Sequence, residues 1–219
     1  MDWYPLLNSL RIAATSTVVV FLLGVWLADV VAHAHRVVKG VLDVVLTLPL
    51  VLPPTVVGYM LLMLLGPRRP VGAWVLSTLG IKLTMTWYSA IFATVVVSFP
   101  LMYRTARGAF EQMDANILAA ARTLGVSEWR IFWHVLVPNA KAGILAGLVL
   151  SFTRAVGEFG ATIMFAGNVP GTTQTMSTAI YAAVQANDYD LAFQWATALV
   201  LFSLVFVVAM NAWLARSRG

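Results

Sequence analysis

Residues 104–141 read RTARGAFEQMDANILAAARTLGVSEWRIFWHVLVPNAK, a polar segment between two strongly apolar ones. Apolar side chains recur in it at helical spacing and predict an amphipathic helix: Phe110, Met113, Ile117, Ala121 and Leu124. Gly125 follows where a left-handed C-terminal cap is needed. Ser127 and Glu128 fit the start of a second helix, and we expect Pro138 to end it. This helix-glycine-helix segment predicts a docking surface for another protein.

Composition places the rest of the chain in a membrane. Hydrophobic residues make up 60% of the sequence and charged residues 11%, whereas soluble domains are about one quarter charged. The mean hydropathy is +0.85. The absence of cysteine excludes disulfides, thiolate metal sites and cysteine nucleophiles. We therefore expect a single membrane domain over residues 1–219.

Five segments are long enough to cross about 30 Å of hydrocarbon, which takes roughly 20 residues. They cover approximately residues 12–31, 44–65, 83–103, 142–165 and 191–214, and they leave residues 104–141 as a loop. The predicted fold class is an all-α membrane protein with five transmembrane helices and a cytoplasmic helix-glycine-helix loop.

Lysine and arginine near the span ends set the orientation, because cytoplasmic loops are enriched in both. If the loop is cytoplasmic, the basic residues inside are Arg36, Lys39, Arg104, Arg107, Arg122, Arg130, Lys141, Arg216 and Arg218. Those outside are Arg11, Arg68, Arg69 and Lys82. This bias predicts a multi-pass protein of the bacterial cell membrane with its N-terminus outside and its C-terminus cytoplasmic. It also explains the net charge of +5 without a nucleic-acid partner.

The first span has a second interpretation as a cleaved signal peptide, with Ala32-His33-Ala34 as the cleavage site. Its apolar stretch is longer than the usual 7–15 residues or so, and the segment before it contains Asp2 and is not basic. Cleavage would also place the basic loop outside. The positive-inside rule therefore favours retention of the first span.

Three prolines interrupt the second span, at Pro49, Pro53 and Pro54. Each removes a backbone donor and clashes with the preceding turn, so a straight helix is not expected. Broken backbone at membrane depth occurs inside protein or beside a water-filled path. Two interpretations stay open, a pathway or gate element and a kink that shapes packing.

Arg154 and Glu158 lie four residues apart in the fourth span and therefore share one helix face. Charges at this depth normally face a protein interior or a cavity. The pair is interpreted either as a gate near a passing anion or as an ion pair that fixes the helix, with the ion pair favoured. Gly157 and Gly160 beside them predict close helix packing.

Catalytic and cofactor motifs are missing from the sequence. It has no GxxxxGK[ST] phosphate loop and no GxSxG elbow, so we expect a chain that is not an enzyme and uses no cofactor. His33, His35 and His134 are too scattered to predict a metal site. The outer segment 167–189 is rich in turn formers. It is interpreted as a contact for an external partner, as a lining of the outer mouth or as a solvated connector.

The loop resembles the EAA loop of bacterial ABC importer permeases. Ala119-Ala120-Ala121, three residues, Gly125, nine residues and Val135-Leu136-Val137-Pro138 match the family spacing of Glu-Ala-Ala, three residues, Gly, nine residues and Ile-x-Leu-Pro. Ala119 stands in place of the family glutamate, which removes one polar contact with the ATPase. The resemblance implies that Ala119, Ala120, Ala121, Arg122, Thr123, Leu124, Gly125 and Pro138 belong to the ATPase-coupling loop.

Other segments are similar to the molybdate branch of this family. They are LPLVLPPTVVGYMLL at 48–62, AARTLG at 120–125 and RAVGEFGATIMFAGNVPGTTQT at 154–175. The resemblance implies a homodimeric pathway driven by two cytoplasmic ATPase subunits and supplied by an external oxyanion-binding protein. Tungstate or sulfate is the alternative substrate. An ATP-independent channel or secondary transporter is a further alternative, which leaves the loop unexplained.

Overall fold

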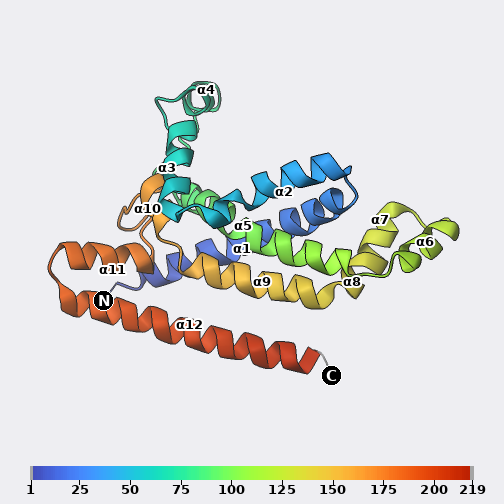
Figure 1. Cartoon of the computed structure of the whole chain (residues 1–219). Helices are drawn as coiled ribbons and strands as arrows, with labels where there is room; N and C mark the ends of the chain where they lie inside the picture. The colour runs from blue at the N-terminus through green and yellow to red at the C-terminus, as the bar shows by residue number, and fades with distance from the viewer. Residues whose placement is uncertain (1, 218–219) are drawn as a thin grey trace.

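The computed structural model describes residues 2–217, and every regular element in that range is a helix (Figure 1). The helices that dominate the fold are α1 (Tyr4–Ala32), α5 (Trp87–Glu111), α9 (Lys141–Val156) and α12 (Tyr189–Ser217). The others are α2 (Arg36–Val51), α3 (Pro54–Leu65), α4 (Pro70–Leu79), α6 (Ala115–Thr123), α7 (Glu128–Ile131), the π-helix η1 (Phe132–Leu136), α8 (Val137–Asn139), α10 (Gly160–Phe165) and α11 (Met176–Gln185). The fold is the all-α membrane fold predicted from composition.

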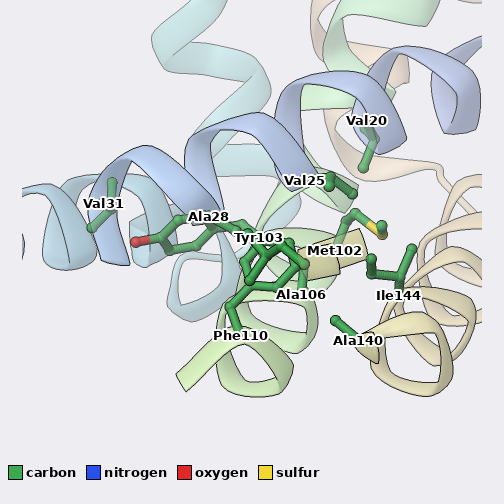
Figure 2. Close-up of a cluster of buried hydrophobic side chains, with 11 residues drawn as sticks. Val20, Val25, Ala28, Val31, Met102, Tyr103, Ala106, Phe110, Ala140 and Ile144 are labelled. Atoms are coloured by element: carbon green, nitrogen blue, oxygen red, sulfur yellow. The ribbon is translucent and has the colours of Figure 1, made fainter. Parts of the chain in front are cut away.

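The core lies where α1, α5 and α9 pack side by side (Figure 1). Small residues let these helices approach closely. A Cβ added at Gly147 would lie 2.1 Å from Thr105 Oγ1, and one added at Gly143 would lie 2.5 Å from the Ala109 Cβ. Around these contacts, α1, α5 and α9 bury one apolar cluster (Figure 2). Figure 2 shows the Tyr103 ring among these side chains, with its hydroxyl on the side away from Met102 and Ile144.

The number of membrane crossings depends on how two bent helix pairs are counted. By length and composition, three described helices can cross a membrane alone: Tyr4–Ala32, Trp87–Glu111 and Tyr189–Met210. The bent pair Arg36–Val51 and Pro54–Leu65 turns by 114°, and the pair Glu128–Asn139 and Lys141–Val156 turns by 77°. If each pair is one crossing, the total reaches five. The predicted number of five therefore stays a prediction.

The predicted span 142–165 is not one continuous helix. α9 ends at Val156 and α10 begins at Gly160. α10 packs against α3 through near-direct backbone contact, because a Cβ at Gly160 would lie 2.9 Å from the Thr55 nitrogen. The close packing expected at Gly160 is confirmed. Gly157 does not take part, since the nearest atom to a Cβ there is Thr153 O at 3.9 Å.

The contact between α3 and α10 predicts a packing defect at Gly58. A Cβ there would lie 2.7 Å from both Cα and O of Ala161, so backbone must shift in the Gly58→Ala variant. We expect a loss of about 1–3 kcal/mol, the usual range for overpacking, measured as a lower melting temperature of the purified protein. The matched control is Gly40→Ala, where a Cβ meets nothing within 4 Å. Equal melting temperatures for the two variants would contradict this packing.

Candidate functional site

The polar loop begins later than the sequence predicted. α5 continues to Glu111 and carries Phe110 as a buried residue, so the prediction that Phe110 belongs to the first loop helix is wrong. The physical reason is that residues after Arg104 still bury one face against α1 and α9. The first loop helix is α6, where Asp114 Oδ1 accepts a hydrogen bond from the Asn116 N–H at 2.9 Å.

Gly125 ends α6 in the predicted conformation. Its φ is +72°, in the left-handed region that favours glycine. The Val126 N–H donates to Ala121 O at 3.2 Å and the Gly125 N–H donates to Arg122 O at 2.9 Å. These two bonds form a Schellman motif. The turn that separates the two loop helices is therefore fixed by backbone geometry.

An ion pair between Arg122 and Glu128 connects α6 to α7 across this turn and was not predicted from the sequence. Arg122 donates to both carboxylate oxygens of Glu128, through Nε at 2.8 Å and Nη2 at 3.2 Å. These hydrogen bonds hold the pKa of the exposed Glu128 carboxyl below its usual range. Ser127 lies at the start of α7, as expected, but its side chain makes no capping bond. The two residues of this ion pair lie on different helices, so spacing within one helix could not predict it.

The apolar stripe predicted for the loop is buried at one end and exposed at the other. Met113 packs against the core cluster that contains Phe110. By contrast, Ile117 is exposed, and 81% of the Leu124 surface is accessible. Trp129 on α7 is 70% exposed. Ala119, Ala120, Arg122 and Thr123 are also exposed, and Ala121 is half-buried. The loop therefore presents an apolar surface on which no other part of the described chain packs.

Pro138 does not end the second loop helix as predicted. The helical run continues through α7, η1 and α8 to Asn139. It passes the proline by widening to a π-turn, in which the Val137 N–H donates to Phe132 O. Asn139 Nδ2 donates to Val135 O at 2.7 Å and satisfies one carbonyl in this widened segment. The 77° bend between this run and α9 occurs at Ala140, between α8 and α9.

The three prolines of the second span lie at or before its bend. Pro49 is inside α2, Pro53 is the N-cap of α3 and Pro54 is its first residue. Val56 and Val57 donate their N–H groups to Pro53 O, at 2.9 and 3.2 Å. The expectation that this span is not straight is confirmed by the 114° bend. A role of the bend as a gate stays a prediction.

Arg154 and Glu158 form the ion pair suggested by their spacing. Arg154 Nη1 lies 2.6 Å from Glu158 Oε2. Glu158 Oε1 accepts a hydrogen bond from the Ala161 N–H at 2.7 Å, and only 3% of the residue is exposed. The carboxylate therefore joins α9 to α10 across the break at residues 157–159. A gating role for Arg154 stays a prediction.

A second charged cluster joins α2 to α5 and was missed. Arg107 pairs with Asp43 and with Glu111, and Lys39 pairs with Glu111 at 2.5 Å. Tyr103 donates its hydroxyl hydrogen bond to Asp43 Oδ1 at 2.5 Å. From the sequence, Arg107 and Lys39 were assigned only to the positive-inside bias. Asp43, which lies just before the predicted span 44–65, was the residue that could have indicated an ion pair with a neighbouring helix.

Residues 172–176, in the segment predicted to lie outside, are attached to the start of α1. Asn8 Nδ2 donates to Gln174 O at 2.9 Å, and Ser9 Oγ accepts from the Met176 N–H at 2.8 Å. Tyr4 donates to Thr172 O at 2.8 Å. Residues 172–176 are thus held by side-chain hydrogen bonds and are more than a solvated connector. In residues 2–217, no group of three or more His, Asp or Glu side chains is arranged to hold a metal ion.

Sequence comparison finds relatives along nearly the whole chain. It is 40% identical over 203 residues to the putative molybdenum transport system permease protein YvgM of Bacillus subtilis strain 168, covering 93% of this chain and 89% of that protein. It is 38% identical over 218 residues to the molybdenum transport system permease protein ModB of Escherichia coli K12, covering 98% of this chain and 94% of the relative.

Structural comparison gives the same fold. A bacterial ABC transporter involved in import of the acidic polysaccharide alginate matches with a TM-score of 0.81 over 97% of this chain and 78% of the other, at 18% identity. The family model for the binding-protein-dependent transport system inner membrane component matches residues 20–218. This chain belongs to the family of binding-protein-dependent transport system inner membrane components.

Proposed function

We propose that this chain is the transmembrane permease subunit of an ATP-driven importer for molybdate. The observation that carries the proposal is the exposed apolar surface of a rigid helix-glycine-helix loop, in a chain whose relatives over more than nine-tenths of its length are named for molybdenum transport. An exposed apolar patch on an ordered loop is typical of a protein interface. The partner in such an importer is a separate ATPase subunit.

Two copies of the chain form the pathway in this proposal. Two cytoplasmic ATPase subunits bind the loops, each receiving α6 around Ala119–Gly125 in a surface cleft. An external oxyanion-binding protein delivers the substrate at the face that carries residues 172–176. The chain crosses the membrane several times, with its N-terminus outside and its C-terminus cytoplasmic. ATP is hydrolysed in the partner subunits.

Two features support a transfer of motion from the loop to the membrane helices. α6 follows α5 after only three residues, and α5 is buried along one face by α1 and α9. Movement of the loops on ATP-driven closure therefore shifts packed helices as rigid bodies. The bend between α2 and α3 gives the hinge at which the pathway changes its opening, and the three prolines belong to that hinge.

Tungstate and sulfate are the alternative substrates, because tetrahedral oxyanions differ little in size. Competition in an uptake assay separates them: excess sulfate that abolishes molybdate uptake, with molybdate barely affecting sulfate uptake, would favour sulfate. A channel or secondary transporter is the alternative from another class. Arg154 and Glu158 are the only charged residues in the middle of a predicted span. A transporter coupled to protons or other ions is expected to have more ionisable groups there. Uptake that persists without an ATPase subunit would favour this alternative.

The direct test is ATP hydrolysis by the chain assembled with its ATPase and binding protein in lipid nanodiscs. Molybdate-loaded binding protein should stimulate hydrolysis more than tungstate- or sulfate-loaded protein. The Gly125→Val variant should lose coupling between hydrolysis and uptake, since a left-handed φ costs other residues about 1–2 kcal/mol and a β-branched residue more. Gly125→Asn is the matched control, because asparagine tolerates this conformation. Wild-type coupling in Gly125→Val would show that the turn geometry is not needed.

The exposed side chain of Leu124 gives a second prediction. In Leu124→Asp an unpaired charge would enter the cleft of the ATPase that receives this apolar surface. We therefore expect the affinity for the ATPase to fall about tenfold or more. Assembly is measured by co-purification and by titration of labelled ATPase. The melting temperature of the permease alone should stay unchanged, because the side chain is 81% exposed. Unchanged ATPase affinity would place the interface elsewhere.

The Arg154–Glu158 pair gives a third prediction, which separates structure from gating. Arg154→Met leaves a buried carboxylate without its countercharge, and we expect a loss of about 3–5 kcal/mol. Adding Glu158→Gln should restore most of the stability, because the amide oxygen can still accept from the Ala161 N–H. Melting temperatures of the single and double variants are the measurement. A stable Arg154→Met with altered uptake would instead support the gate.

A further inference from the structure

A polar hollow of about 380 Å³ lies between α2 and α5, at the end of the molecule from which α6 and α7 project (Figure 1). Apart from Gly108, its walls are polar: Asp43 and Thr47 from α2, and Tyr103, Arg104, Arg107 and Glu111 from α5. We propose that this hollow binds a tetrahedral oxyanion at the inner end of the transport path. The inference rests on the proposed function and adds residues that contact the substrate.

The cations of the hollow are not all neutralised. Arg107 is shared between Asp43 and Glu111, and Lys39 pairs with Glu111. Arg104 is exposed and forms no ion pair with any residue of the described range 2–217. Arg104 is therefore the lining cation without a carboxylate partner in that range, while Lys39, outside the lining, shares Glu111 with Arg107. The free guanidinium of Arg104 offers an anion charged hydrogen-bond donors, whereas the Thr47 hydroxyl already donates to Asp43 O at 2.5 Å.

The carboxylates compete with an anion for the same guanidinium. Nε of Arg107 donates to Glu111 Oε1 at 3.0 Å, and its Nη1 donates to the Tyr103 hydroxyl at 3.2 Å. A dianion that enters beside Arg104 can replace Asp43 at Arg107, because guanidinium binds tetrahedral oxyanions and carboxylates with similar bidentate geometry. A hollow of about 380 Å³ leaves room for an oxyanion and for water beside it.

Anion binding at this point would also loosen α2. No α2 residue is fully buried. Leu42 and Leu46 pack partly buried against the core, and the ion pairs of Asp43 and Lys39 add charged attachments to α5. An anion that displaces Asp43 removes one of these attachments. Arrival of the substrate at the inner end and release of α2 are thereby linked, and the paired carboxylates hold α2 against α5 when no anion is bound.

The cysteine-free sequence allows a direct test in the full chain assembled with its ATPase in nanodiscs. Gly108→Cys places one thiol in the hollow, where a Cβ meets nothing within 4 Å. Gly40→Cys is the matched control, since its Cβ is equally unobstructed and Gly40 does not line the hollow. The rate of modification by an anionic methanethiosulfonate reagent is measured with molybdate, sulfate or phosphate, against chloride at equal ionic strength.

We expect the oxyanions to slow modification of Gly108→Cys and to leave Gly40→Cys unchanged. Arg104→Gln should weaken this protection about tenfold or more, since it removes charged hydrogen bonds. Asp43→Asn should strengthen protection, because Arg107 loses its competitor. Nanodiscs of neutral lipid and of anionic lipid are compared, since a lipid phosphate offers the same chemistry. Protection that requires anionic lipid and is absent with soluble oxyanions would overturn the proposal.

Two further outcomes separate this inference from the proposed function. If no oxyanion protects Gly108→Cys while the same preparation imports molybdate, the hollow is not an anion site and the importer stands. If oxyanions protect Gly108→Cys but no ATPase supports uptake, the hollow binds anions and the importer proposal fails. Equal protection of Gly108→Cys and Gly40→Cys would also overturn the site, because it would reflect general screening.

Discussion

A helix that breaks inside a membrane leaves backbone groups without hydrogen-bond partners, and in this chain the carboxylate of Glu158 supplies one such partner. Backbone N–H and C=O groups at membrane depth must find partners within the protein. Where α9 stops and α10 starts, one oxygen of Glu158 accepts the Ala161 N–H and the other faces Arg154. One buried side chain thus bonds to both sides of the break. α10 packs with its backbone directly against α3.

The helices around this break differ in how they are held. α5 is fixed by small-residue contacts along α1 and α9, where neighbouring backbones almost touch. α2 has no fully buried residue, and its ion pairs and hydrogen bond to α5 come from Lys39 and Asp43. Apolar packing is rigid and continuous, whereas ion pairs at a water-accessible surface can exchange partners. The fold therefore combines a closely packed connection to the loop with a helix, α2, that is held by partly buried leucines and by ion pairs.

Much of this arrangement could be read from the sequence, because the signals were local. Hydropathy predicted the membrane class, Gly125 predicted the left-handed turn, and the spacing of Arg154 and Glu158 predicted their pair. Pro138 was misjudged because the π-turn in η1 absorbs the missing donor, which no local pattern reveals. Phe110 was assigned to the loop because its periodicity continues across the end of α5. The Asp43–Arg107 and Arg122–Glu128 pairs join separate helices, so single-helix spacing could not find them.

The spin-label distance between α2 and α5 tests most directly whether the loop moves this helix. Labels at Gly40→Cys and Gly108→Cys, in complexes with one doubly labelled protomer, are measured by double electron–electron resonance without nucleotide and after trapping with ATP and vanadate. A shift in the main distance upon trapping is the expected result, because the proposed hinge at the bend between α2 and α3 moves α2 relative to α5 when the ATPases close. An unchanged distance distribution, in a preparation that hydrolyses ATP and imports molybdate, would contradict a hinge at α2.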